Sequence, residues 1–138
     1  MLISDSFELQ PGRCAVQTNE ITGEIIDAGI KVHRHLGPGL LESAYETVLA
    51  YELRQRGLKV ETQLTLHIVY EGVSLDAGYR IDMFVEDEII VELKAVEKMI
   101  PLYEAQLLSY LKLKKKKVGL LINFHVALLK DGIKRMAN

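Results

Sequence analysis

The sequence has few of the residues on which several common site classes depend. Its 138 residues include one cysteine, Cys14, and no tryptophan. A single cysteine excludes an internal disulfide and a cysteine-built zinc site, and is the usage expected in a reducing compartment. No apolar run approaches the roughly 20 residues of a membrane-spanning helix, and the first residues, MLISDSFELQ, lack the features of a secretory signal. We therefore expect a soluble, cytoplasmic protein with one domain, the usual arrangement at about 100–150 residues.

Several catalytic motifs are also missing. The chain contains no GxGxxG, GxxxxGK[ST] or GxSxG motif, which excludes the usual dinucleotide fingerprint, the P-loop and the nucleophile elbow. His33 and His35 are two residues apart on a predicted helix, so they would point about 200° apart and cannot share a metal ion. His67 and His125 are isolated in the sequence. We expect each histidine to be a surface or packing residue.

Charge is unevenly distributed along the chain, although the net charge is only −2. Residues 112–138 carry eight basic groups and one acid, whereas the first 111 residues carry 9 basic and 18 acidic groups. A basic end is common in proteins that bind nucleic acid. Lysines that complement the dipole at a helix C-terminus would give the same pattern. On charge alone, this second interpretation is favoured.

Hydropathy patterns predict an α/β fold. Residues 1–19 show no sustained periodicity and are expected to form an N-terminal extension to a domain of residues 20–138. The predicted elements are helices over residues 20–36 and 41–56, strands over 59–70, 74–85 and 88–96, a helix over 101–117 and a strand over 118–124. Pro101 suits the first position of its helix. The tail from Val126 is expected to add an edge element, and the whole to form a mixed central sheet flanked by helices.

The hairpin of residues 80–94 is the most informative segment. If its turn is centred on Asp87, opposed residues have numbers that sum to 174, so Asp82 faces Glu92 and Arg80 faces Lys94. Side chains alternate between the faces of a sheet. One face is then wholly apolar and is expected to be core: Ile81, Met83, Val85, Ile89, Val91 and Leu93. The other face carries Asp82, Glu92 and Lys94, unless a turn of even length moves Asp82 to the opposite side.

This polar face has two interpretations. Two carboxylates directly across a ladder repel one another unless a cation lies between them. Oxygen ligands without sulfur or imidazole select a hard ion, Mg²⁺ or Mn²⁺, and Lys94 could then polarise a metal-bound water. A solvated hairpin face with an ordinary lysine–carboxylate pair explains the same residues. From these residues alone the two interpretations are level.

Polar residues also fall on the apolar stripes of two predicted helices. Glu42 shares a helical face with the apolar residues of its helix, which indicates either a paired or metal-bound carboxylate or a solvated acid near the positive end of the helix dipole. Gln106 and Tyr110 share the stripe of the third predicted helix. They could reach the acidic face or hydrogen-bond the backbone at the edge of the sheet.

Together, these residues resemble the PD-(D/E)XK nuclease superfamily. Three motifs match in order: Gly39–Tyr45 as the GxxExxY signature of a group of small prokaryotic proteins, Asp82 with Glu92-Leu93-Lys94 as the D…ExK core, and Gln106 with Tyr110 as the QxxxY element of the RecB-like branch. The likeness runs from about residue 20 to the end. Ile81 stands where the superfamily name has proline, and an apolar residue suits that core position.

The resemblance implies a restriction-endonuclease-like αβββαβ core with an extra N-terminal helix, and hydrolysis of phosphodiester bonds in DNA with Mg²⁺ or Mn²⁺. By this likeness, Asp82, Glu92 and the Leu93 carbonyl would bind the ion. Glu42 would hold it through water or bind a second ion, and Lys94 would orient or activate the attacking water. Gln106 and Tyr110 would position the strand. Phosphate contacts would come from the basic run: Lys112, Lys114, Lys115 and Lys116.

The resemblance implies that the partner is nucleic acid, with DNA favoured over RNA, and that the protein does not bind a membrane. Relatives in the superfamily are often dimers, so the resemblance leaves a homodimer open. The alternative function is a non-catalytic nucleic-acid-binding or protein-interaction module on the same fold. An aromatic content of 7% leaves few stacking platforms for single strands, although Tyr103 and Tyr110 could serve.

Overall fold

The computed structural model describes the backbone of residues 11–138 and the side chains from Gln17 onward. Its elements are α1 (Pro11–Leu36), α2 (Glu42–Gln55), β1 (Val60–Tyr70), β2 (Val73–Val85), β3 (Ile89–Lys94), α3 (Pro101–Lys114), β4 (Val118–Asn123), the 3-10 helix η2 (Leu129–Gly132) and β5 (Ile133–Ala137). This order contains the expected αβββαβ core, preceded by α1 and followed by an edge strand. The predicted fold class is confirmed.

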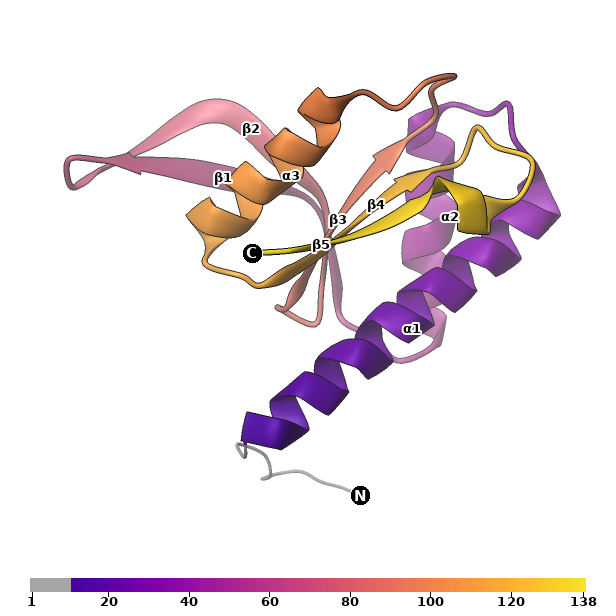
Figure 1. Cartoon of the computed structure of the whole chain (residues 1–138), viewed down its shortest axis with the longest axis horizontal. Helices are drawn as coiled ribbons and strands as arrows, with labels where there is room; N and C mark the ends of the chain where they lie inside the picture. The colour runs from indigo at the N-terminus through magenta and orange to yellow at the C-terminus, as the bar shows by residue number, and fades with distance from the viewer. Residues whose placement is uncertain (1–10) are drawn as a thin grey trace.

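The five strands form one mixed sheet in the order β1-β2-β3-β4-β5. The β3–β4 pair is parallel and the other three pairs are antiparallel. Helices α1 and α2 pack on one face of the sheet and α3 on the other (Figure 1). All six residues of β4 are buried, as expected for a short apolar strand covered on both faces.

Two apolar clusters fill the spaces between helices and sheet. Helix α1 contributes Ile21, Ile25, Ala28 and Val32, at helical spacings of three and four, to the cluster under α1 and α2. Every residue of the predicted apolar hairpin face is fully buried. Ile81, however, packs in the cluster under α3, whereas Met83 packs in the cluster on the other side of the sheet. The expectation of a single face is therefore wrong for Ile81, because regular pairing of β2 with β3 extends only to Met83.

Two helix ends differ from the expected boundaries. Helix α1 begins at Pro11 and not near Glu20, so residues 11–19 of the predicted extension are helical, and residues 1–10 lie outside the described part of the chain. Proline is tolerated in a first helical turn because that turn needs no N–H donor. Helix α3 ends at Lys114, three residues before the expected end, because Lys115 adopts a left-handed conformation with φ +59°. A left-handed residue commonly ends a helix, but it is usually glycine.

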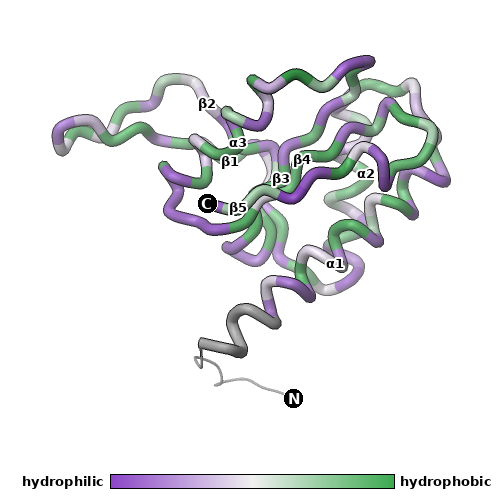
Figure 2. The backbone as a smooth tube through the Cα atoms, viewed as in Figure 1, coloured by the Kyte–Doolittle hydropathy of each residue, from purple (hydrophilic) through white to green (hydrophobic). Residues whose placement is uncertain are grey.

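The β1–β2 hairpin projects from the body of the molecule (Figure 1). We call residues 67–80 of this hairpin the arm. Its turn lies between the two predicted strands: Tyr70 pairs with Val73, and Glu71 and Gly72 between them have φ of +49° and +80°. Figure 2 shows hydrophobic segments along the arm and a hydrophilic tip. Within the described residues, no helix has both the length and the apolar character needed to cross a membrane.

Gly132 provides a test of the packing that holds β5 to the sheet. A Cβ at this position would lie 2.3 Å from the backbone oxygen of Asn123. We expect Gly132→Ala to lower the free energy of unfolding by about 1–3 kcal/mol, as overpacking does in well-packed cores. The measurement is urea-induced unfolding followed by circular dichroism.

Gly23→Ala is the matched control. Gly23 lies in α1, and a Cβ there meets nothing within 4 Å, so the change should raise helix stability by about 0.5–1 kcal/mol. Equal stability of the two variants would contradict the packing described for Gly132.

Candidate active site

The site begins where strands β2 and β3 stop pairing. The register is the one predicted for a turn centred on Asp87, with Val85 opposite Ile89 and Met83 opposite Val91. Regular pairing ends there, and the two strands diverge toward the upper edge of the sheet in Figure 1. The predicted pairing of Arg80 with Lys94 is therefore absent from the β2–β3 register.

Two carboxylates bridge the strands at this point. Glu92 Oε2 accepts a hydrogen bond of 2.9 Å from the backbone N–H of Asp82, and Asp82 Oδ2 accepts one of 2.9 Å from the N–H of Leu93. Each side chain thus bonds to the backbone of the opposite strand. Because only one oxygen of each carboxylate is used in this way, Asp82 Oδ1 and Glu92 Oε1 remain for other partners.

Lys94 lies at the end of β3 on a fixed backbone. Its carbonyl accepts a 2.8 Å hydrogen bond from the N–H of Phe124, and its ammonium nitrogen lies 4.5 Å from the ring centroid of Tyr103 on α3. The charge of Lys94 lowers the pKa of Asp82 and of Glu92, in each case against a larger effect of burial. The three predicted residues are therefore close enough to interact.

Helix α2 adds two further acids, and a buried tyrosine fixes the start of that helix. The hydroxyl of Tyr45 donates to the carbonyl of Gly37 at 2.5 Å and accepts from the N–H of Leu40 at 3.1 Å. Its ring stacks on Phe124 at a centroid distance of 4.4 Å. The tyrosine of the GxxExxY pattern is thus a structural clamp for the loop that precedes Glu42.

Glu42 and Glu46 lie one turn apart on α2. Burial is the main cause of the raised pKa of Glu42, the charge of Asp82 adds to it, and Lys94 opposes it. The pKa of Glu46 is raised by burial and by Asp82, against the effect of a hydrogen bond from Gln63. The interaction of Glu42 with Asp82 and Lys94 agrees with its predicted place near the site.

Gln63 connects Glu46 to the pair formed by Asp82 and Glu92. Its side-chain nitrogen lies 2.7 Å from Glu46 Oε1 and 3.4 Å from Asp82 Oδ1. The backbone of Gln63 has φ +52° within strand β1, an uncommon conformation for a residue with a side chain. Sequence analysis missed Glu46 and Gln63. The spacing of Glu46 from Glu42 was a usable signal, whereas nothing in the alternation of β1 marks Gln63.

Asn123 is a third residue that sequence analysis missed. It is 3% exposed and bonds to both backbone groups of Val96, with Oδ1 accepting at 3.1 Å and Nδ2 donating at 2.9 Å. These bonds tie the segment after Lys94 to the end of β4. Asn123 therefore supports the site without facing it.

The cluster contains more acidic than basic side chains. Burial, and then the charge of Asp82, raises the pKa of Glu92 to about 8. Burial also raises the pKa of Tyr110 to about 12, with Glu92 and Asp82 contributing. The acids are thus partly desolvated neighbours that disfavour one another's charged forms, which is the environment that a bound cation would relieve.

The donor set fits a hard divalent ion, although the side chains are not arranged around one. Among the described residues, no three His, Cys, Asp or Glu side chains form a group that could hold a metal ion. The reason lies in the cross-strand bonds, which turn one oxygen of Asp82 and one of Glu92 toward backbone N–H groups. The remaining carboxylate oxygens are hard ligands of the type that Mg²⁺ and Mn²⁺ prefer, and the excess of acidic groups favours a cation.

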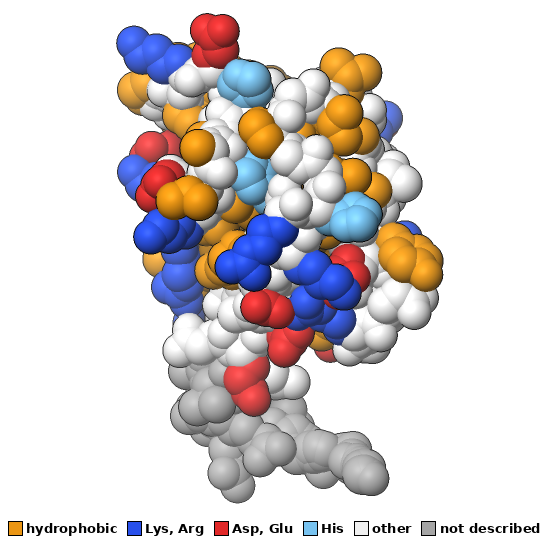
Figure 3. Space-filling view, turned by 90° about the vertical axis from the view of Figure 1, so that its right-hand side faces the viewer, with side chains coloured by type: hydrophobic (Ala, Val, Ile, Leu, Met, Phe, Trp, Pro, Cys, Tyr) orange, Lys and Arg blue, Asp and Glu red, His pale blue; other side chains and the backbone are white. Residues whose placement is uncertain are grey.

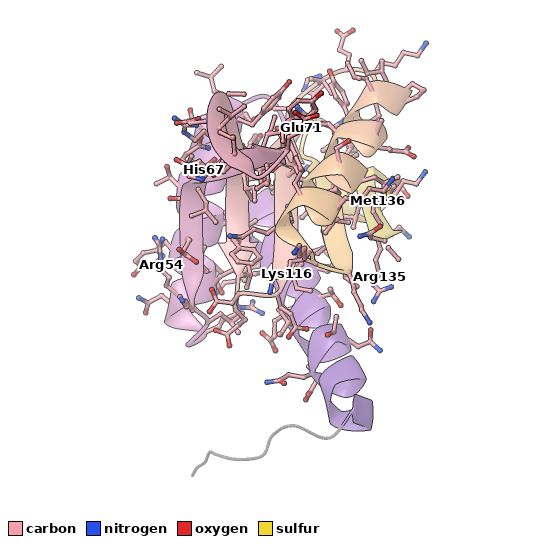
Figure 4. The ribbon with its side chains drawn as sticks, turned by 90° about the vertical axis from the view of Figure 1, so that its left-hand side faces the viewer. Arg54, His67, Glu71, Lys116, Arg135 and Met136 are labelled. Atoms are coloured by element: carbon pink, nitrogen blue, oxygen red, sulfur yellow. The ribbon has the colours of Figure 1, made fainter. Side chains whose placement is uncertain are left out.

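Helix α3 places the predicted Gln106 and Tyr110 beside Lys94. All three line one cavity of about 580 Å³. The basic run lies elsewhere: none of its four predicted contact residues lines this cavity, and the ammonium groups of Lys114 and Lys116 lie 5.4 and 5.8 Å from the ring of Phe84. Figure 4 shows Lys116 well away from Glu71 at the tip of the arm.

The histidines are surface or packing residues, as expected. His33 is buried and its Nε2 lies 2.8 Å from the carbonyl of Val126. His35, His67 and His125 are exposed.

The comparisons with known proteins agree with this geometry. The model of the PD-(D/E)XK nuclease superfamily matches residues 19–136, so the chain belongs to this superfamily. No curated protein and no solved structure matches the chain. The narrower likeness to the GxxExxY group and the RecB-like branch stays a prediction.

The pKa of Glu92 gives a prediction for the metal-free protein. The folded state binds a proton at Glu92 with a pKa of about 8, against 4.5 for an unperturbed glutamate. The unfolded state loses this proton first, so the free energy of unfolding should fall as pH rises from about 5 to 8. With about 1.4 kcal/mol per pKa unit, the expected loss is a few kcal/mol, measured by urea unfolding in EDTA across this pH range.

Glu92→Gln should remove most of this pH dependence, because glutamine retains an oxygen that can accept from the N–H of Asp82. Glu104→Gln is the control, since Glu104 is an exposed partner of Lys134. A wild-type protein whose stability is flat across this range would contradict the buried, proton-binding state of Glu92.

Proposed function

We propose that the protein is a metal-dependent nuclease that hydrolyses phosphodiester bonds, with DNA as the preferred nucleic acid. The observation that carries the proposal is the reciprocal bonding of Asp82 and Glu92 at the strand divergence, with Lys94 at the end of the same strand. Membership of the PD-(D/E)XK superfamily supports the same class of chemistry. Nucleases of this superfamily generally use Mg²⁺ or Mn²⁺.

Each residue has a role that its position supports. Asp82 and Glu92 would bind the ion through their remaining oxygens, together with the Leu93 carbonyl, and Glu42 would bind it through water or hold a second ion. The bound ion would polarise a phosphate oxygen and lower the pKa of water. Lys94 would hold the attacking water and stabilise the negative charge that develops on the phosphate oxygens. Gln106 and Tyr110 would donate hydrogen bonds that position the strand.

The reaction is an in-line displacement at phosphorus. The water oxygen forms a new bond to phosphorus, the bond to the leaving sugar oxygen breaks, and the leaving oxygen receives a proton. The raised pKa of Glu42 and its interaction with Lys94 support a further role for this carboxyl, which could accept the proton that the attacking water loses.

A second candidate is a binding module without catalysis on the same fold. The two bonds that Asp82 and Glu92 accept from backbone N–H groups are compatible with it, because they stabilise the strand divergence without any ion. Calorimetric titration with Mn²⁺ separates the two candidates. The nuclease should release or absorb heat that is lost in Asp82→Asn, whereas a metal-free module should give no heat that depends on Asp82.

The direct test is hydrolysis of labelled DNA and RNA in Mg²⁺ or Mn²⁺. We expect Asp82→Asn and Lys94→Met each to reduce the rate by about 100-fold or more, the range found for loss of one preorganised electrostatic group. Asp87→Asn and Lys59→Met are matched controls, because these residues form an exposed ion pair of 3.0 Å between the turn that joins β2 to β3 and the residue before β1.

The controls should keep the wild-type rate. Hydrolysis that is equal in all four variants would come from a contaminating enzyme, and the proposal would then be wrong. Absence of hydrolysis in the wild-type protein, with no Asp82-dependent Mn²⁺ binding, would favour the binding module.

A further inference from the structure

We propose that the groove between the arm and α3 binds an unpaired nucleic-acid strand, so that the substrate is single-stranded and not duplex. This inference rests on the proposed function and names the substrate class of the same site. The groove is the cavity of about 580 Å³ whose lining includes Lys94, Gln106 and Tyr110.

The walls of the groove offer flat apolar surfaces. Tyr79 comes from the arm, and Tyr103 and Tyr110 come from α3. Leu102 extends the α3 wall and is 68% exposed. Aromatic rings of this kind stack on bases of any sequence.

An irregularity in β2 turns Tyr79 toward α3. The β1–β2 register shifts after Thr65–Arg80, and the ladder resumes at His67–Asp76. Gly78 lies in this bulge with φ +85°, and its N–H donates to Asp76 Oδ1 at 2.9 Å. Bulges commonly re-aim a side chain next to a functional site.

The result of the bulge is a tyrosine pair across the groove. The rings of Tyr79 and Tyr110 meet edge to face at a centroid distance of 6.1 Å. Tyr79 nevertheless stays 44% exposed. Part of Tyr79 is therefore accessible to a further partner.

The groove is continuous with the candidate active site. Lys94 lines the groove and follows Glu92 by two residues on β3, next to Leu93, whose N–H donates to Asp82. The ammonium nitrogen of Lys94 lies 4.5 Å from the ring centroid of Tyr103 in the same lining. A strand whose bases lie against the tyrosines would therefore bring its backbone to the acidic cluster.

The charge and the size of the groove favour an unpaired strand over a duplex. Lys94 is the one charged residue in the lining, as far as the described residues extend, whereas a protein that grips a duplex neutralises several phosphates with lysine and arginine. A volume of about 580 Å³ falls within the roughly 300–1,000 Å³ of sites that enclose small ligands. Such a space accepts bases and sugars of a strand but not a whole double helix.

Two further cavities, of about 450 and 500 Å³, lie outside the groove, and the lining of one contains a single tyrosine and that of the other none. Figure 3 shows basic, acidic, histidine and apolar side chains interspersed on the face opposite the groove, without one continuous field of either charge. The three tyrosines beside Lys94 thus distinguish the groove from these two cavities.

The test is binding of the full chain to fluorescent oligonucleotides of about 12 nucleotides, a length within the site sizes of single-strand binders. Unpaired DNA, unpaired RNA and a blunt DNA duplex are compared by anisotropy in Ca²⁺, and a gel verifies that each oligonucleotide stays intact. We expect an unpaired strand to bind at least tenfold more tightly than the duplex. Tyr79→Ala should weaken that binding by roughly 5- to 100-fold, the range for loss of one stacked base.

Two pairs of variants keep the result specific. Tyr51→Ala is the control for Tyr79→Ala, because Tyr51 is 63% exposed on α2 and does not line the groove. Leu102→Glu adds a negative charge to the groove wall and should also weaken binding of the unpaired strand. Leu128→Glu is its control, at an exposed leucine outside the groove. Thermal unfolding verifies that all four variants are folded.

The outcomes separate this inference from the proposed function. Equal affinity for unpaired strand and duplex, or equal affinity of the Tyr79 and Tyr51 variants, would overturn the groove assignment even if the protein hydrolyses DNA. Tight, Tyr79-dependent binding of unpaired strands without hydrolysis in Mg²⁺ or Mn²⁺ would support the groove and overturn the nuclease proposal.

Discussion

The structure depends on the exchange of two hydrogen bonds where β2 and β3 separate. Elsewhere in the pair, backbone groups satisfy one another, but at Asp82 and Leu93 the N–H donors are satisfied by the carboxylates of the opposite strand. Donors left without partners at this depth would cost about 1–3 kcal/mol each. The acids are therefore part of the sheet as well as of the site, and a change that removes their oxygens also disturbs the fold.

Three separate segments bring their groups to this point. The loop before α2 is clamped by the Tyr45 hydroxyl, which sets where Glu42 lies. The end of β4 fixes the backbone of Lys94 and the segment that follows it, in part through Asn123. Helix α3 can approach closely because Gly119 on β4 has no side chain; a Cβ there would lie 2.9 Å from a methyl group of Leu107. Much of the packing around the site is thus made by residues that are not themselves reactive but that position those that are.

The sequence was sufficient for the register and insufficient for the details of the strands. The odd-length turn at Asp87 was enough to give the register of Val85 with Ile89 and of Met83 with Val91, because pairing in a ladder follows from counting. Asp82 and Glu92 lie just beyond the end of this ladder and meet through bonds from backbone N–H groups to their side chains. Counting fails at irregularities: the bulge at Gly78 and the left-handed Gln63 depend on tertiary contacts with α3 and α2. The spacing of Glu46 from Glu42 indicates the same face of α2, but the bond between Glu46 and Gln63 could be found only once α2 and β1 were placed relative to each other.

The arm and α3 form the two sides of one groove but are anchored differently. Helix α3 is packed along the sheet, whereas the arm is a two-stranded ribbon, and such a ribbon has little stability of its own. The bulge lies at the base of the arm, next to the part of β2 that carries Asp82, and Tyr79 in this bulge contacts Tyr110 on α3. One wall of the groove is therefore part of the packed body of the molecule, and the other is a solvent-exposed ribbon that is tied to α3 at its base.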